Sequence, residues 1–412
     1  MGGLEPAGTL HGRLQRGRGV GARRAVSVPG AGELVYDCIR RDPREDRQVE
    51  ARAWYLTRLV VGLGLPVGPI AGHLLARVDA AGDDEWRAGL AIDVLVGMAG
   101  RGRGDAVGPL RRYVAEGRYW RWALEAMWES GGPALCEGLA EVVLARADDA
   151  GLCDAVDPGW GPWAAWSSAQ PRIRDALRAR HADRASAARR QPPDVTAMTG
   201  GQLVALVRRS FWPALVELGR RGDLVVLELA EERALRNAWG GLPRLAGALR
   251  ELGAAALPRA RIWAAGDDAL LAAHGIDVLA DHGDAGDLDV LLQALTDAVQ
   301  AGDWCAAEAP ARGLGRLRAA RAAPVLREAW AATTHSYARA DILTGLRGAA
   351  PQDADRYLDE ALDDCEPRVR RLACTAAAPA MLARVRARRD DPLENDEVRA
   401  AAADRLHTRH QD

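Results

Sequence analysis

The chain contains 412 residues, and its 55 basic side chains nearly balance 57 acidic ones, giving a formal net charge of −2. A balance so near neutrality does not favour a dedicated nucleic-acid-binding domain, because such domains are usually clearly basic. Every basic residue apart from the histidines is Arg, which excludes chemistry that depends on a Schiff-base lysine or a P-loop lysine.

Residues 1–32 are rich in Gly and Arg and contain no apolar segment of the kind found in a secretory signal. We expect a disordered tail here. Further along, apolar stretches such as Leu59–Val67 are short and interrupted by Gly, so no membrane association is expected. The six cysteines form no C-x-x-C pair, which is typical of reduced thiols and favours a cytoplasmic location.

Residues 33–150 carry apolar positions at helical spacing and are expected to form N-terminal helical repeats. Helix starts at Trp86 and Trp120 are 34 residues apart, and a similar start at Val49 precedes the first by 37. Spacings of this size are typical of repeats that each contain a pair of helices. Trp122 and Trp128 follow Trp120 closely. Since the chain has a single Phe, we interpret these three tryptophans as large side chains of the core.

Residues 151–201 interrupt this spacing with five prolines and are expected to form an irregular repeat and a basic linker between two helical blocks. Tryptophan recurs here at every third residue and is followed by a run of arginines, and both residue types are enriched at the hot spots of protein interfaces. Core packing of the tryptophans and a solvated helix face for the arginines are the alternatives. The predicted partner-binding residues are Trp160, Trp163, Trp166, Arg172, Arg174, Arg178 and Arg180.

Residues 202–412 show the most regular spacing. Apolar helix starts recur with steps of 33, 33, 32 and 29 residues, at Leu271, Trp304, Tyr337, Val369 and Val398. The clearest unit, Trp304–Trp330, divides into two apolar helical stripes joined by a short basic turn. Pro324 opens the second stripe, where a proline costs no hydrogen bond because the first turn of a helix leaves that N–H unpaired. The pattern predicts stacked helix pairs.

Two of these units open with an acidic residue shortly before Val-Arg, at Glu366 in EPRVRRLA and at Asp396 in DEVRAAAADRL. Together with the Pro-then-Leu opening at Pro324, they resemble the HEAT repeat, in the short form also seen in phycobilin lyases. The resemblance is good from about Leu235 to Leu406, closest from Gly313 to Trp330, and looser in residues 33–150. It implies an all-α fold, an alpha-alpha superhelix (HEAT-like α-solenoid), with HEAT-like repeats in both segments.

Few other patterns suggest chemistry. The segment Asp281–Asp289 has the oxygen-rich composition of a calcium loop, but Leu292 stands where an EF-hand needs its bidentate carboxylate. We interpret that segment as a turn between two helices. The sequence separation between His335 and Cys365 or Cys374 does not indicate a catalytic cysteine with a histidine as its general base. No catalytic, metal-binding or cofactor-binding residue is therefore predicted.

The predicted function is that of a non-catalytic HEAT-repeat scaffold, not an enzyme, that binds a protein or peptide partner through its curved surface. Stacked helix pairs leave an extended groove suited to such binding. A nucleic acid is a less favoured partner. The resemblance also implies an alternative, which is a HEAT-like DNA-binding enzyme similar to alkylpurine glycosylases, or a bilin lyase-like protein.

Overall fold

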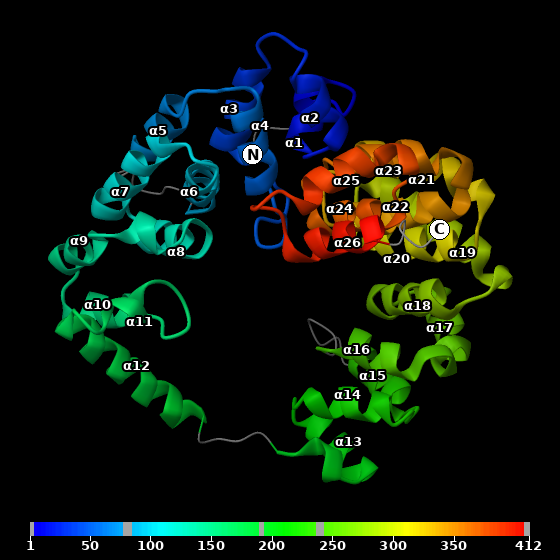
Figure 1. Ribbon diagram of the computed structural model, residues 1–412. Helices are drawn as coiled ribbons and strands as arrows, with labels where there is room; N and C mark the ends of the chain where they lie inside the picture. The colour runs from blue at the N-terminus through cyan, green and yellow to red at the C-terminus, as the bar shows by residue number, and fades with distance from the viewer. Residues whose placement is uncertain (1–3, 77–84, 189–192, 236–242, 408–412) are drawn as a thin grey trace. The chain divides into compact units, whose positions relative to one another are not determined.

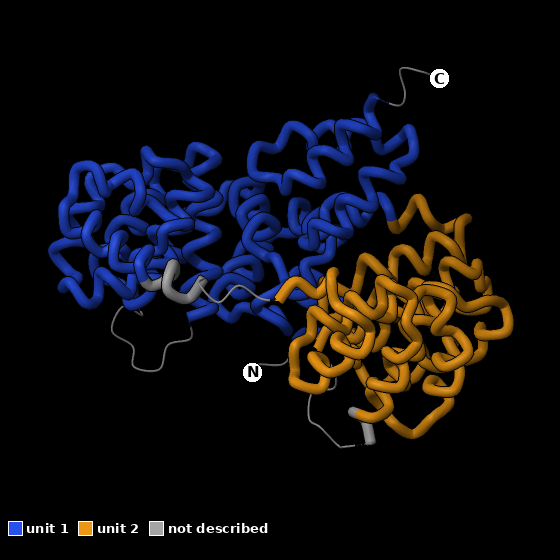
Figure 2. Tube along the Cα trace, turned by 90° about the horizontal axis from the view of Figure 1, so that it is seen from below, with its two compact units in different colours: residues 1–191, 358–412 blue, residues 192–357 orange. Residues whose placement is uncertain are grey.

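The computed structural model describes residues 4–76, 85–188, 193–235 and 243–407, and every regular element in those ranges is a helix (Figure 1). The fold is therefore all-α, as the sequence predicts. It divides into two compact units, unit 1 with residues 1–191 and 358–412, and unit 2 with residues 192–357 (Figure 2). None of the described helices combines the length and the apolar character that crossing a membrane requires.

Unit 1 takes most of its helices from the first part of the chain. These are α1 (Leu10–Gln15), α2 (Gly19–Ala25), α3 (Ala31–Arg41), α4 (Ala53–Gly62), α5 (Gly68–Leu75), α6 (Glu85–Gly100), α7 (Val107–Glu116), α8 (Trp120–Gly131), α9 (Leu139–Arg146), α10 (Asp149–Ala155), α11 (Trp163–Trp166) and α12 (Pro171–Ala188). The C-terminal segment adds α24 (Pro367–Ala376), α25 (Leu382–Arg389) and α26 (Asp396–His407), and α23 (Ala354–Ala361) crosses the boundary between the units. Within unit 1, α6 packs against both α4 and α8, α7 packs against α9, and α24 packs against α26.

Unit 2 contains α13 (Gly200–Arg208), α14 (Pro213–Arg220), α15 (Val225–Leu235), α16 (Leu245–Leu252), α17 (Leu257–Ala264), α18 (Ala269–His282), α19 (Leu288–Ala301), α20 (Trp304–Arg316), α21 (Ala323–Ala332) and α22 (Arg339–Ala349). Here α20 packs against α18 and α22, and α19 packs against α21. Contact between every second helix is the arrangement of stacked helix pairs. A Cβ at Gly313 of α20 would lie 2.6 Å from the Cα of Ala280 in α18, so the glycine permits this close approach.

A short 3-10 turn leads directly into the second helix of successive pairs. These turns begin at Gly253, Ala285, Ala320, Pro351 and Pro379, which are 32, 35, 31 and 28 residues apart. Their recurrence matches the spacing that the sequence predicts for this part of the chain. The interpretation of the aspartate-rich segment as a turn is also confirmed. Asp284 accepts a hydrogen bond from the Gly286 N–H at 2.8 Å, and Asp287 accepts one from the Asp284 N–H at 2.9 Å.

The N-terminal residues differ from the expected disordered tail. Residues 4–32 of that segment are described, and they form α1, α2 and the start of α3. Arg18 is buried and pairs at 2.8 Å with Glu360, which lies 342 residues later in the chain, and Arg23 pairs with Asp359. Two of the arginines in this segment are thus paired with carboxylates from the other end of unit 1, a pairing that composition does not reveal.

Two expected boundaries also differ from the observed ones. Residues 358–412 belong to unit 1, whereas the sequence placed them in one block with residues 202–357. The expected linker within residues 151–201 is largely helical, since α12 alone has 18 residues. Its proline at position 171 starts the helix instead of breaking it, because the first turn tolerates proline. Residues 189–192 of the expected linker lie outside the described residues.

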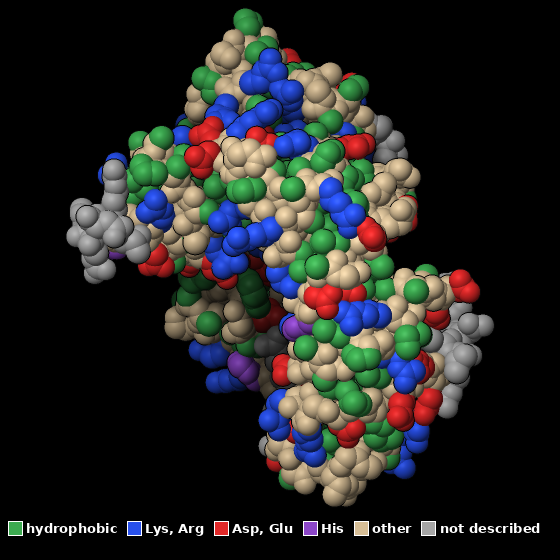
Figure 3. All heavy atoms as spheres, turned by 90° about the vertical axis from the view of Figure 1, so that its right-hand side faces the viewer, with side chains coloured by type: hydrophobic (Ala, Val, Ile, Leu, Met, Phe, Trp, Pro, Cys, Tyr) green, Lys and Arg blue, Asp and Glu red, His purple; other side chains and the backbone are tan. Residues whose placement is uncertain are grey.

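Charges of both signs are interspersed on the surface. Figure 3 shows basic and acidic side chains spread over the face that it presents. Many of them form short-range exposed pairs, such as Arg112 with Glu116 at 3.0 Å and Arg399 with Asp396 at 2.6 Å. Exposed pairs of this kind contribute little to stability, so a polar site is more informative where charges are buried.

Candidate functional site

A cavity of about 770 Å³ lies within unit 1, bordered by α4, α6 and α8 and by residues 160 and 393. Its volume falls in the range of about 300–1,000 Å³ that is usual for ligand pockets. Its aromatic lining consists of Trp54, Tyr119, Trp122 and Trp160. Its charged lining consists of Glu85, Asp93, Arg101, Arg118, Arg121, Glu125 and Glu129.

Small residues on α6 bring the walls of this cavity together. A Cβ at Gly89 would clash with the ring of Trp122 on α8, and a Cβ at Gly97 would lie 2.6 Å from Oγ1 of Thr57 on α4. Trp122 also meets Trp86 edge to face, with ring centroids 5.5 Å apart. Glycine at these two positions therefore lets α6 pack closely against both neighbouring helices and fixes the Trp122 indole at the cavity.

Asp93 of α6 is the most perturbed carboxyl group in the cavity. Trp122 Nε1 donates a hydrogen bond to its Oδ1 at 3.0 Å. Burial raises the Asp93 pKa to about 6, and this effect outweighs the Trp122 hydrogen bond, which lowers the pKa. Its Oδ2 has no hydrogen-bond partner among the residues that the structure describes. This oxygen is an acceptor available to a ligand.

Carboxylates outnumber positive charges around the cavity, four against three arginines. Glu125 and Glu129 of α8 have raised pKa values, because surrounding protein atoms exclude water from their charged forms. Arg101 is already paired with Asp391 at 2.7 Å, and Arg121 lies 4.0 Å from Glu125. The cavity therefore has one more carboxylate than arginines in its lining, with Asp93 and Glu125 partly buried and Glu85 and Glu129 exposed.

Trp54 of α4 forms another wall, and its indole is surrounded by guanidinium groups. The Cζ atoms of Arg370, Arg58 and Arg388 lie 3.7, 4.7 and 5.1 Å from its ring centroid. Arg370 also bonds to the buried carboxylate of Glu394 at 2.6 Å. The Trp54 Nε1 is buried and has no hydrogen-bond partner within the described ranges. Cation–π contacts with these three guanidinium groups thus stabilise the position of the Trp54 indole.

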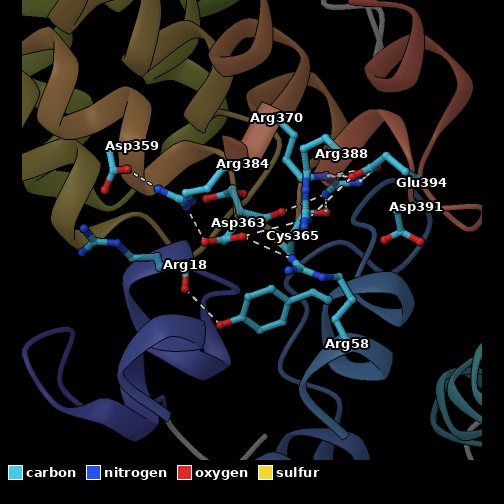
Figure 4. A network of polar contacts seen from close by, with 12 residues as sticks. Arg18, Arg58, Asp359, Asp363, Cys365, Arg370, Arg384, Arg388, Asp391 and Glu394 are labelled. Atoms are coloured by element: carbon cyan, nitrogen blue, oxygen red, sulfur yellow. Dashed lines mark hydrogen bonds and ion pairs between the residues drawn. The ribbon is translucent and has the colours of Figure 1, made fainter. Parts of the chain in front are cut away.

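The same guanidinium groups belong to a network that joins the two segments of unit 1 (Figure 4). Asp363 lies at its centre and pairs with Arg58 at 3.3 Å, with Arg388 at 3.9 Å and with Arg384. Burial acts to raise the pKa of Asp363, but these arginines outweigh it and lower the pKa. The carboxylate therefore stays ionised, and α4 is held against the C-terminal segment behind the cavity.

Of the predicted tryptophans, Trp160 lines the cavity and is 61% exposed. Trp163 is fully buried and meets Trp120 and Trp166 edge to face, with centroids 6.3 and 5.8 Å apart. Trp166 is partly buried. Trp163 therefore packs in the core, the alternative that the sequence left open, and the structure does not bring the three indoles to one surface.

The predicted arginines lie on α12, and the cavity lining does not include them. Arg172 donates to two backbone carbonyls at the end of α9, both at 2.9 Å, and pairs with Asp149 at 2.8 Å. Arg172 thus donates hydrogen bonds to carbonyl groups that have no partner within α9, because the last turn of a helix leaves its carbonyls unpaired. Arg178 makes a surface ion pair within its own helix. Arg174 and Arg180 are partly exposed.

Sequence reasoning did not single out Asp93, and it assigned Trp122 to the core. Trp122 does pack against the core, but it also faces the cavity. A signal was present, since Asp93 is the lone charged residue in the apolar run from Leu90 to Met98. A carboxylate in such a run needs a hydrogen-bond partner or polar surroundings, and here it has both.

Comparison with protein-family models, with curated proteins and with solved structures finds no match to this chain.

Proposed function

We propose that this protein is a non-catalytic binding protein, built as a HEAT-like α-solenoid, that takes a basic side chain of a protein or peptide partner into the cavity of unit 1. The observation that carries the proposal is the combination, in one cavity, of indole faces with four carboxylates, two of which, Asp93 and Glu125, are partly buried. A cytoplasmic location is part of the proposal, and the six cysteines, none in a disulfide, support it.

The chemistry of the lining suits an organic cation. A guanidinium or ammonium group over an indole is attracted by the negative face of the ring, most strongly where water is excluded. Asp93 offers a carboxylate oxygen beside the Trp122 indole. Burial raises the pKa values of Asp93 and Glu125, and an incoming cation would favour their charged forms.

A peptide is also a suitable occupant in size. The cavity of about 770 Å³ exceeds what a single side chain fills, so it leaves room for the adjoining backbone. Trp160, exposed at its edge, adds an aromatic surface of the type found at protein interfaces. These features support a short basic segment of a partner as the ligand.

The test is a titration of the full-length protein with fluorescently labelled peptides, followed by fluorescence anisotropy. The central residue is Arg, Lys, citrulline or Ala. We expect the Arg and Lys peptides to bind best, because citrulline keeps the shape of Arg without its charge. Asp93→Asn should weaken binding of the Arg peptide about tenfold or more, since a hydrogen bond to a charged group contributes about 1.5–3 kcal/mol.

Asp175→Asn is the matched control, because Asp175 is an exposed carboxylate on α12 that does not line the cavity. It should bind the Arg peptide as the unaltered protein does. Equal affinity for the citrulline and Arg peptides, or full affinity in Asp93→Asn, would contradict the proposal.

A glycosylase-like DNA-binding enzyme is the second candidate. It is favoured by the meeting of a carboxylate, indoles and arginines in the cavity, which is the combination that the resemblance implies for such enzymes. The surplus of carboxylates opposes the approach of phosphates, and we therefore rank it second. Release of a methylated base from duplex DNA by the protein, and its loss in Asp93→Asn, would establish this candidate instead.

A further inference from the structure

Three potential metal ligands, none of them among the residues that line the cavity, converge in unit 2. Cys305 and Glu308 lie on α20, and His335 lies between α21 and α22. One ligand atom from each, the thiol sulfur, a carboxylate oxygen and an imidazole nitrogen, all lie within 4.8 Å of one another. Among the described residues, no other group of three or more His, Cys, Asp or Glu side chains has its ligand atoms within this distance of one another.

We propose that Cys305, Glu308 and His335 bind a divalent transition-metal ion, with zinc the ion that their ligand atoms fit best. The site is independent of the proposed peptide-binding cavity.

The start of α20 presents two of the ligands on one face. Residues three apart on a helix are neighbours, which places Glu308 one turn beyond Cys305. The helix start is well defined, since Asp303 accepts a hydrogen bond from the Ala306 N–H at 3.0 Å and Trp304 is buried. The Cys305 thiol therefore lies in the first turn of α20, on the same face as the Glu308 carboxylate.

The third ligand is held by a buried polar turn. His335 is only 5% exposed. The hydroxyl of Thr333 donates to the His335 backbone carbonyl at 3.1 Å, and the imidazole stacks on Tyr337 with ring centroids 6.1 Å apart. The first contact fixes the His335 backbone and the second lies against its ring, so the imidazole is held in a buried turn beside α20.

The ligand set selects the class of ion. Thiolate, imidazole and carboxylate are the three ligand types of protein zinc sites, with bonds of about 2.0–2.3 Å. In a tetrahedral site such ligands lie roughly 3.3–3.8 Å apart, and the three ligand atoms already lie within 4.8 Å of one another, with Cys305 exposed. A thiolate disfavours Mg²⁺ and Ca²⁺, which prefer oxygen ligands. Three protein ligands leave a fourth position for water.

The test is a titration of the chelator-treated full-length protein with Co²⁺, which replaces Zn²⁺ and has visible absorption. We expect one equivalent to bind, with d–d bands and a near-ultraviolet thiolate-to-cobalt band, and Zn²⁺ to displace it. Cys305→Ser should abolish the thiolate band and weaken binding at least about tenfold, because even loss of an outer contact weakens metal binding 10–100-fold. Affinity should fall as the pH is lowered, because the ligands must lose their protons.

Cys153→Ser is the matched control, a partly buried cysteine on α10 that should leave the spectrum unchanged. His335→Gln and Glu308→Gln should weaken binding while the circular-dichroism spectrum stays helical. If His335→Gln unfolds, Cys305→Ser still decides, since its exposed side chain tolerates substitution. A protein without a thiolate-to-cobalt band, or a band that survives in Cys305→Ser, would overturn the proposal.

Discussion

Asp93 illustrates a conflict between stability and binding at the level of one residue. Its carboxyl group contacts the cavity, yet burial raises its pKa to about 6. The ionised form predominates at neutral pH, and its burial therefore lowers the unfolding free energy of the protein. Strongly perturbed groups of this kind cluster at functional sites. A neutral isostere would serve the fold better, so the carboxylate is best explained by what it binds.

Asp93→Asn should therefore stabilise the protein in a pH-dependent way. The folded-state pKa lies above the ordinary value of 3.8. The carboxyl group therefore lowers the unfolding free energy by nothing below about pH 4, where it is protonated in both states. The loss grows between about pH 4 and 6 and stays constant at higher pH. We expect the gain in unfolding free energy of Asp93→Asn to grow over that interval to roughly 2–3 kcal/mol. Urea unfolding at several pH values measures it, and a gain independent of pH would contradict the assigned pKa.

At the level of elements, the distance between α6 and α8 depends on glycine. Gly89 is buried against the Trp122 ring, and the same ring donates to Asp93 from its nitrogen. A side chain at position 89 would therefore disturb both the packing of two helices and the cavity. By contrast, Gly72 of α5 is exposed and has no atom within 4 Å of the position where a Cβ would stand.

Gly89→Ala and Gly72→Ala should have opposite effects on stability. Gly89→Ala overpacks the contact between α6 and α8, and we expect it to lower the unfolding free energy by about 1–2 kcal/mol, even after the helical preference of Ala. Gly72→Ala should raise it by about 0.4–1 kcal/mol, because Ala restricts the unfolded chain. Thermal and urea unfolding of the two variants compare them directly. Equal effects would refute a close contact at Gly89.

At the level of the whole molecule, unit 1 is assembled from both ends of the chain. Its first and last segments are joined by buried ion pairs and by the stacking of Arg370 on Trp54. Arg370 and Glu394 are almost completely buried, and a buried charge that loses its partner is costly. The cavity depends on this closure, because Trp54 comes from the first segment and Leu393 from the last.

Arg370→Ala should consequently lower the unfolding free energy by about 3–5 kcal/mol, since it leaves Glu394 buried and unpaired. Hydrogen exchange should show lost protection in α4 as well as in α24. The control is the neighbouring Arg371→Ala, whose pair with Glu397 is exposed and should contribute no more than about 1 kcal/mol. If α4 kept its protection in Arg370→Ala, the two segments would not stabilise each other as described.

The repeated helices could be predicted because their signal is local. The predicted start at Trp304 is the first residue of α20, and Leu271 and Val398 fall within the first turns of α18 and α26. The site could be predicted only in part. Trp160 was selected and lines the cavity, but Trp163 was selected on the same pattern and is buried. Trp160 precedes α11 and Trp163 is its first residue, and the regular spacing of the tryptophans does not show which of them faces solvent.

What the sequence by itself determined is that the described residues fold entirely as helices, because apolar periodicity and helix starts act over a few turns. The tertiary structure alone decided which segments share a unit. Arg18 meets Glu360, and the segment 358–412 joins the N-terminal helices. It also placed His335 beside Cys305. Such contacts depend on how distant segments pack, since burial selects partners by their position in space and not by their separation along the chain.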